Sequence, residues 1–395
     1  MKLPFRLFEC SLLACTILVF SCQSNHNDYA QNIIIEGTIA QIDSYGGLIA
    51  SFKPLEMEAK GIDYGDLLRL YIGDNIVVDA PYVDSYNQAG NMSICICNYN
   101  KQNTDTSISL ANGSFALHIG GRTGDRLAIA MKEKEGYLYE YNLLKGTYSY
   151  SREDYSSDEV FANFREVVTT GIKPGMLYRS TSPINFKSNK VRYTYADELC
   201  RKNGIKTIID IADSDESVKE MLASKEHQGS YVNVTLTEKN IVGIGSDADF
   251  VRPEFMKGLT RALREIIVRE GPFLIHCNEG KDRTGFYFLL LESLAGASLE
   301  EVKTDYMLTF ENMYKQQRGT EQYELAWKKN GQCMLYYMGH PELWSKIGFV
   351  DMDQCSIQGE NLFMIAQNYI LLAGLSMDEI DKLKEKIFAS AKTAQ

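Results

Sequence analysis

The sequence predicts a small all-β domain followed by a larger α/β domain with a central sheet flanked by helices. The chain has 395 residues, more than a single hydrophobic core usually serves. Short apolar segments separated by glycines fill its first third, and strand-like segments then alternate with helical periodicity. We expect five segments: a signal peptide at 1–21, a tether at 22–31, a β-rich domain at 32–147, a linker at 148–158 and the α/β domain at 159–395.

The amino terminus has the layout of a secretory signal. Lys2 and Arg6 precede an apolar run at 11–20, which is shorter than the roughly 20 residues of a membrane-spanning helix. The segment Val19-Phe20-Ser21-Cys22 resembles the lipobox of bacterial lipoproteins, although Phe20 is bulkier than usual. This resemblance implies a lipid on Cys22 that anchors the protein outside the cytoplasm at a bacterial membrane. The alternative is an ordinary secretory signal.

The β-rich region shows short apolar runs of alternating pattern, with glycine pairs between them. Such a pattern is typical of a β-sandwich or barrel. The strands are expected at Ile33–Ile42, Leu67–Ile72, Asn75–Asp79, Met92–Cys97, Ser114–Ile119 and Arg126–Met131.

Charge and cysteine content exclude several classes of function. The net charge of -11 argues against nucleic acid as a partner, because nucleic-acid-binding proteins need a basic surface. The six cysteines beyond Cys22 show neither a dense disulfide framework nor a zinc-binding pattern. We therefore expect no metal and no cofactor.

In the α/β region, four strands are expected at Met176–Ser180, Thr207–Asp210, Tyr231–Val234 and Phe273–His276. Apolar residues at helical spacing predict a helix over 253–269, which Gly271-Pro272 ends. Two capping boxes, starting at Ser298 and Ser376, predict the first turns of two further helices.

The segment that carries chemistry follows the strand at Phe273–His276. Cys277 opens a loop, Arg283 closes it with five residues between them, and an apolar helix follows. A loop between a strand and a helix can direct consecutive backbone amides toward an anion, and the helix dipole adds positive potential. We expect the amides of 278–283 to hold a phosphate over the Cys277 sulfur.

The side chains of this loop fit a covalent mechanism. The guanidinium of Arg283 matches two phosphate oxygens, and thiolates are good nucleophiles. Thr284 is placed to hydrogen-bond the sulfur. The expected substrate-binding residues are Asn278, Glu279, Gly280, Lys281, Thr284 and His276.

The run His276-Cys-Asn-Glu-Gly-Lys-Asp-Arg-Thr-Gly285 resembles the signature of cysteine-based protein tyrosine phosphatases, in the bacterial and fungal branch with Lys-Asp-Arg. Flanking segments at 176–183 and 298–307 resemble it too, and the likeness spans about 155–375. It implies Cys277 as nucleophile, Arg283 as phosphate clamp, Asp282 as general acid and Lys281 as a contact for further phosphates. Implied substrates are phosphotyrosine proteins or peptides first, and inositol phosphates or phosphoinositides second.

Two departures from the family pattern and one alternative stand beside this assignment. Asp210-Ile-Ala-Asp213 replaces the usual Asp-Leu-Arg, so a basic residue is missing, and Glu279 must point away from a bound dianion. Many phosphatases carry the acid on a mobile loop roughly 30 residues before the cysteine, where this chain offers Asp247 and Asp249 among glycines. We favour Asp282, since the Lys-Asp-Arg branch is the nearer match.

A second resemblance concerns the first domain. Residues 37–48 and 65–70 resemble the β-rich C-terminal domain of S-adenosylmethionine hydroxide adenosyltransferases and related halogenases, whose catalytic domain has no counterpart here. A scaffold or binding role is therefore expected. Two rival functions remain for the chain: a catalytically silent phosphate-binding module and, less favoured by Lys281-Asp-Arg-Thr284, a sulfur-transfer enzyme.

Overall fold

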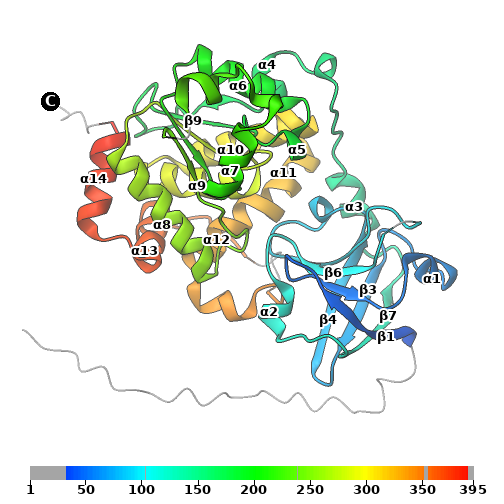
Figure 1. Ribbon diagram of the computed structural model, residues 1–395. Coiled ribbons are helices and arrows are strands. Elements are labelled where there is room, and N and C mark those ends of the chain that lie inside the picture. Colours follow the sequence, from blue (N-terminus) through cyan, green and yellow to red (C-terminus); the bar gives the residue numbers. More distant parts are fainter. Residues whose placement is uncertain (1–32, 103, 238, 351–354, 390–395) are drawn as a thin grey trace, which may run out of the picture.

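The computed structural model describes residues 33–389, except 103, 238 and 351–354. The expected signal peptide, tether and lipid site at Cys22 lie outside these residues. Figure 1 shows a β-barrel beside a larger domain of mixed helices and strands. Within the described residues, no helix has the length and apolarity to cross a membrane.

Seven strands close into the barrel in the order β1-β2-β6-β5-β4-β3-β7. All neighbouring pairs are antiparallel except β4 and β5. Alternate side chains of β3 are fully buried, as expected for a strand with one face toward the core. The strands are β1 (Ile33–Ile42), β2 (Leu48–Ala50), β3 (Leu67–Ile72), β4 (Ile76–Val83), β5 (Ile94–Cys97), β6 (Ser107–Leu110) and β7 (Arg126–Glu133).

Three short helices accompany the barrel: α1 (Pro54–Ala59), α2 (Phe115–Ile119) and α3 (Leu138–Leu144). The expected strand at Ser114–Ile119 is wrong, because these residues form α2. Five residues are too few for periodicity to separate strand from helix. Phe115 and Ala116 are buried, and Gly120 ends the helix in the left-handed conformation with φ 67°.

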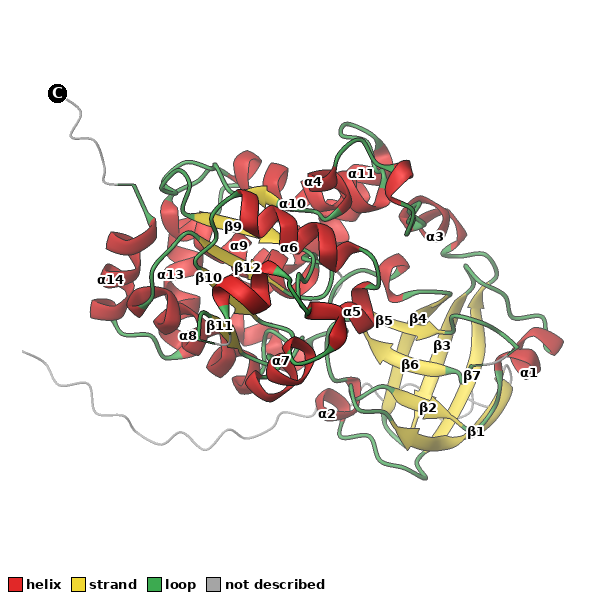
Figure 2. Cartoon of the chain, turned by 45° about the horizontal axis from the view of Figure 1, so that its top comes forward, coloured by secondary structure: helices red, strands yellow, loops and turns green. Residues whose placement is uncertain are grey.

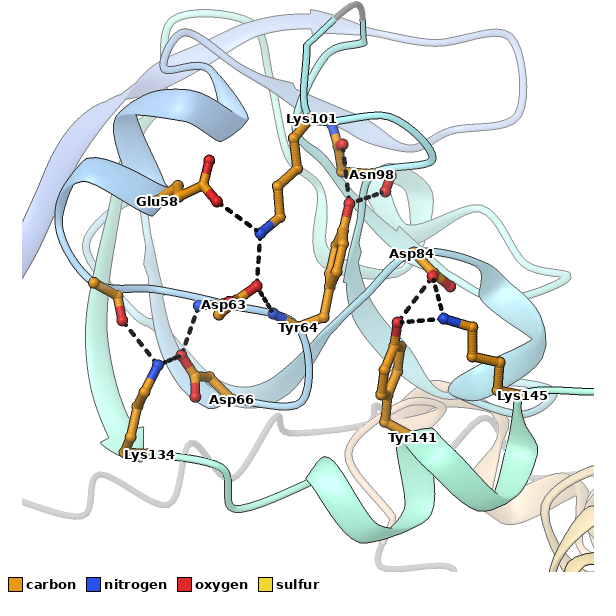
Figure 3. Close-up of polar contacts among 11 residues, drawn as sticks. Glu58, Asp63, Tyr64, Asp66, Asp84, Asn98, Lys101, Lys134, Tyr141 and Lys145 are labelled. Carbon is orange, nitrogen blue, oxygen red and sulfur yellow. Dashed lines mark hydrogen bonds and ion pairs between the residues drawn. The ribbon is translucent and has the colours of Figure 1, made fainter.

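Hydrogen bonds and ion pairs join segments of the barrel domain to one another and to α3 (Figure 3). The buried carboxylate of Asp66 accepts bonds from the amides of Asp63 (2.8 Å) and Glu135 (2.9 Å) and from Lys134 Nζ (2.9 Å). Asp84 Oδ2 accepts from the hydroxyl of Tyr141 on α3 at 2.8 Å. These contacts hold the segment that leads out of the barrel.

The larger domain is built on a five-stranded sheet of order β11-β10-β12-β9-β8, parallel except for β8. Its strands are β8 (Arg165–Glu166), β9 (Leu177–Ser180), β10 (Thr207–Asp210), β11 (Ile241–Gly243) and β12 (Phe273–His276). Figure 2 shows this sheet surrounded by helices. The helices are α4 (Asp158–Phe161), α5 (Phe186–Asn189), α6 (Arg192–Lys202), α7 (Asp215–Leu222), α8 (Pro253–Val268), α9 (Asp282–Ala295), α10 (Leu299–Tyr314), α11 (Glu321–Trp327), α12 (Cys333–Gly339), α13 (Leu362–Ala373) and α14 (Met377–Ile387).

Alternation along the strands assigns the two faces of this sheet to different cores. Ile208 and Leu274 pack with apolar residues of α6 and α7, whereas Ile209 and Ile275 pack with those of α8, α9, α13 and α14. The second of these cores continues into the barrel interior, so one buried cluster runs through both domains.

The strand expected at Tyr231–Val234 is also wrong. Residues Val232–Leu236 form a short π-helical turn, and β11 takes the edge of the sheet instead. Asp197 explains the difference, since its carboxylate accepts the amides of Tyr231 (3.0 Å) and Val232 (2.8 Å) and caps the turn. The two expected capping boxes are confirmed at the starts of α10 and α14.

Candidate active site

The candidate loop, residues 277–281, joins the inner strand β12 to the first turn of α9. In a parallel sheet, the carboxyl end of a strand and the amino terminus of the next helix meet at one edge. Gly280 has φ +72°, and a Cβ at this position would lie 2.3 Å from the backbone oxygen of Ser180. The loop therefore requires glycine here.

The carbonyl groups of the loop are bound from outside. Asn278 O accepts the amide of Ser182 (3.0 Å), Glu279 O accepts Asn163 Nδ2 (3.2 Å), and Gly280 O accepts Arg179 Nη2 (2.9 Å). Because C=O and N–H of a trans peptide point in opposite directions, the amides of 279–281 face away from these partners.

The amides of the loop remain free to bind a ligand. Among the described residues, no backbone N–H of 278–283 donates a hydrogen bond to the chain. Six successive donors at a helix amino terminus form a site for a tetrahedral anion.

A buried ion-pair network supports the loop from the β9 side. Arg179 Nη1 lies 2.6 Å from Asp305 Oδ2, and Arg165 Nε lies 2.9 Å from Asp305 Oδ1. Burial alone would raise the pKa of Asp305, but the guanidinium groups of Arg165 and Arg179 hold it below its usual range. Burial, together with the Asp305 carboxylate, raises the pKa of the neighbouring Glu292 well above its ordinary value.

Cys277 follows β12 directly and is 4% exposed. The preceding His276 is fully buried, and its Nδ1 lies 3.1 Å from Cys277 O. Burial lowers the pKa of His276 to about 4, so the imidazole is neutral and Nδ1–H donates to this carbonyl. Its Nε2 lies 3.8 Å from Asp210 Oδ2, and burial raises the pKa of Asp210 to about 8.

Arg283 reaches a cleft of about 680 Å³ between the two domains. Its Nη1 donates to Ser246 O at 3.2 Å, which brings the loop before α8 next to the guanidinium. Cys277 is not among the residues that line this cleft. Thr284 is fully buried next to Arg283, and its hydroxyl has no hydrogen-bond partner in the described part of the chain.

The charged side chains of the loop have different partners. Asp282 Oδ2 lies 3.6 Å from Lys281 Nζ, while Asp282 Oδ1 is buried without a partner among the described residues. Lys281 is itself buried, and its ammonium donates to Asn87 Oδ1 of the barrel. Glu279 Oε2 accepts the hydroxyl of Tyr314 at 2.9 Å.

The two alternative acids occupy unlike positions. Asp247 lines the cleft beside Arg283 and forms an ion pair with Arg252. Asp249 is fully buried, and its Oδ2 accepts the amide of Ser114 (3.1 Å) and faces His118 Nε2 (2.9 Å), both from the barrel. The structure thus places Asp249 in the domain contact and Asp247 at the cleft.

Several residues that shape the site had no assigned role in the sequence analysis. Arg179, Asn163 and Ser182 hold the loop carbonyls. From the barrel, Asn87 binds Lys281 of the loop and Ser114 binds Asp249. Arg179 and Ser182 lie in the segment 176–183 that carried the family resemblance, which was the available signal. Nothing in the local pattern distinguishes the barrel residues.

Comparison with known proteins adds three findings. Residues 159–389, more than half of the chain, match the tyrosine phosphatase family. No curated protein matches the sequence. A solved structure, "Crystal structure of uncharacterized conserved protein from Thermotoga maritima", is 15% identical with a TM-score of 0.22 and covers 25% of this chain. The match spans 38% of that protein and supports no inference about fold or function.

Proposed function

Because this chain belongs to the tyrosine phosphatase family, we propose that it hydrolyses phosphomonoesters through a phosphocysteine intermediate on Cys277. The observation that carries the proposal is the set of six amides at 278–283 that donate to no group of the described residues and follow Cys277 in the loop that Arg283 closes. These amides and the guanidinium would stabilise the negative charge of a bound phosphate without first rearranging.

In the first step, the Cys277 thiolate attacks phosphorus and the bond to the leaving oxygen breaks. Arg283 binds two of the non-bridging oxygens, and Asp282 gives its proton to the leaving oxygen. In the second step, water attacks phosphorus, Asp282 takes a proton from that water, and the sulfur leaves as thiolate. Thr284 has a free hydroxyl to stabilise the departing sulfur. No step requires a metal.

Asp282 is the better candidate for the acid. Its Oδ1 has no partner in the described chain, whereas Asp249 is bound by two barrel groups and Asp247 by Arg252. A general acid needs an unoccupied oxygen within reach of the leaving group. Asp282→Asn should therefore lower turnover of a substrate with a poor leaving group by about 10²–10⁴-fold. Asp247→Asn should lower it less.

The substrate that we propose first is phosphotyrosine on proteins or peptides, with inositol phosphates as the rival. Lys281, the residue expected to contact additional phosphates, is buried against Asn87 of the barrel. Its ammonium already has an acceptor there, which weakens the case for a polyphosphorylated substrate.

The proposal is tested with a substrate panel on the purified protein lacking its signal peptide. Wild type should hydrolyse p-nitrophenyl phosphate and phosphotyrosyl peptides, and acid quenching should trap labelled phosphate on the protein. Cys277→Ser should lose turnover by about a thousandfold or more while still binding phosphate. Cys200→Ser, at another buried cysteine on α6, is the matched control.

If wild type hydrolyses no aryl phosphate between pH 5 and 8 yet binds phosphate, the chain is a phosphate-recognition module instead.

We also propose that a lipid on Cys22 holds the protein at a bacterial membrane surface, outside the cytoplasm. The polar run 23–28 after Cys22 supports this reading. Labelled palmitate fed to cells that express the full chain should enter wild type, while Cys22→Ala should remain unlabelled.

A further inference from the structure

The cleft at Arg283 is built by both domains. The barrel contributes the turn at 42–46 and residues in and next to α2, and the larger domain contributes the loop 245–248, Arg252, Glu254 and Arg283. Figures 1 and 2 both show α2 on the side of the barrel that faces the larger domain. A ligand whose phosphate meets Arg283 would have its remaining atoms next to the barrel.

Direct bonds fix these barrel residues, the barrel wall of the cleft, relative to the larger domain. The amide of Ser114 and Nε2 of His118 meet Asp249, and Lys281 donates to Asn87. The buried apolar cluster shared by the two domains reinforces these bonds. The wall is therefore a defined part of the site's surroundings.

The charges of the cleft favour a ligand with a single phosphate. Its two lining cations are Arg252 and Arg283, and Arg252 is ion-paired with Asp247 and with Glu254 (3.0 Å). Within the described part of the chain, Arg283 donates only to the carbonyl of Ser246. With Asp43 as a third lining carboxylate, a second phosphate on the ligand would be repelled.

The barrel wall also presents apolar surface. Tyr45 is 84% exposed and Leu117 is 62% exposed, and both line the cleft. A cleft of about 680 Å³ has the size of pockets that enclose several side chains or a drug-sized ligand. An apolar residue beside a phosphotyrosine could cover these two side chains.

We propose that Tyr45 and Leu117 determine substrate specificity by binding an uncharged, apolar residue that flanks the phosphotyrosine of a peptide. The barrel is then part of the substrate-binding surface. The carboxylates of Asp43, Asp247 and Glu254 in the cleft repel acidic flanking residues. This inference rests on the proposed phosphatase function and goes beyond it, since the candidate loop at 277–281 would contact only the phosphate of the substrate.

The experiment compares kcat/KM for a leucine-flanked phosphotyrosyl peptide, a glutamate-flanked one and p-nitrophenyl phosphate. Wild type should prefer the leucine-flanked peptide. In Tyr45→Ala/Leu117→Ala, kcat/KM for that peptide relative to p-nitrophenyl phosphate should fall about tenfold. The control is Tyr99→Ala/Leu55→Ala, which alters barrel residues that are 61% and 50% exposed and lie outside the cleft. It should keep the wild-type ratio.

A ratio within twofold of wild type in the double variant, or an inositol phosphate preferred to both peptides, overturns the inference while leaving the phosphatase proposal intact. If no substrate is turned over, the phosphatase proposal fails. The role of Tyr45 and Leu117 is then tested by measuring peptide binding. Fluorescence anisotropy of the leucine-flanked peptide with Cys277→Ser should then show about tenfold weaker binding when the Tyr45→Ala and Leu117→Ala changes are added. Equal binding overturns the inference.

Discussion

We predict that Asp210, which lies beside His276 at the end of strand β10, makes the free energy of unfolding depend on pH. Its Oδ1 accepts the amides of Ala212 (2.9 Å) and Asp213 (3.0 Å), while Oδ2 faces His276 Nε2 at 3.8 Å. Burial, aided by the Asp213 carboxylate, raises the pKa of Asp210 from 3.8 to about 8. Asp210→Asn keeps the acceptor for both amides and removes the titration.

The direction follows from proton binding in the two states. Between pH 3.8 and 8 the folded protein holds a proton on Asp210 that the unfolded chain lacks, so the free energy of unfolding falls as pH rises. His276, whose pKa burial lowers from 6.5 to about 4, acts in the opposite sense between pH 4 and 6.5. The effects of these two groups nearly cancel there, and of the two only Asp210 titrates from pH 6.5 to 8.

At about 1.4 kcal/mol per pH unit, wild type should lose about 2 kcal/mol relative to Asp210→Asn between pH 6.5 and 8. Urea unfolding followed by tryptophan fluorescence measures this, because both tryptophans, Trp327 and Trp344, lie in the larger domain. If the difference between the two proteins stays constant within about 0.5 kcal/mol across that range, Asp210 is ionised in the folded state and the reasoning is wrong.

Three further substitutions test the support of the site and of the barrel. Gly280→Ala should lower stability by about 2 kcal/mol or more and weaken phosphate binding in calorimetry, because its Cβ would meet Ser180 O and φ is +72°; wild-type binding would contradict this. Arg179→Met should lower the free energy of unfolding in urea by about 3–5 kcal/mol, because it removes one partner of the buried ion pair with Asp305. A loss below about 1 kcal/mol would show that this ion pair does not stabilise the fold. Asp66→Ala should cost about 2–3 kcal/mol in thermal unfolding by removing the acceptor of two amides, and an unchanged Tm would refute that role.

Local pattern alone was enough for the element that carries the chemistry. The apolar strand Phe273–His276, the glycine at 280 and the apolar helix after Arg283 predicted a strand, a loop and a helix in this order, which the structure shows. Strand β10 and the caps of α10 and α14 were likewise predicted, because alternation and capping depend on residues close in sequence. Where a run was short, as at Ser114–Ile119, the same reasoning failed.

The sequence by itself predicted a β-rich region before an α/β region, and it predicted the strand, loop and helix that contain Cys277 and Arg283. Only the tertiary structure decided that Lys281 donates a hydrogen bond to Asn87 and that Asp249 accepts one from the amide of Ser114 in the barrel. It also brought Tyr45 to the cleft beside Arg283, over 200 residues away in sequence. The physical reason is that hydrogen bonding within a strand, turn or helix end is encoded by neighbouring residues, whereas contacts between domains arise from surfaces that meet only after each domain has folded.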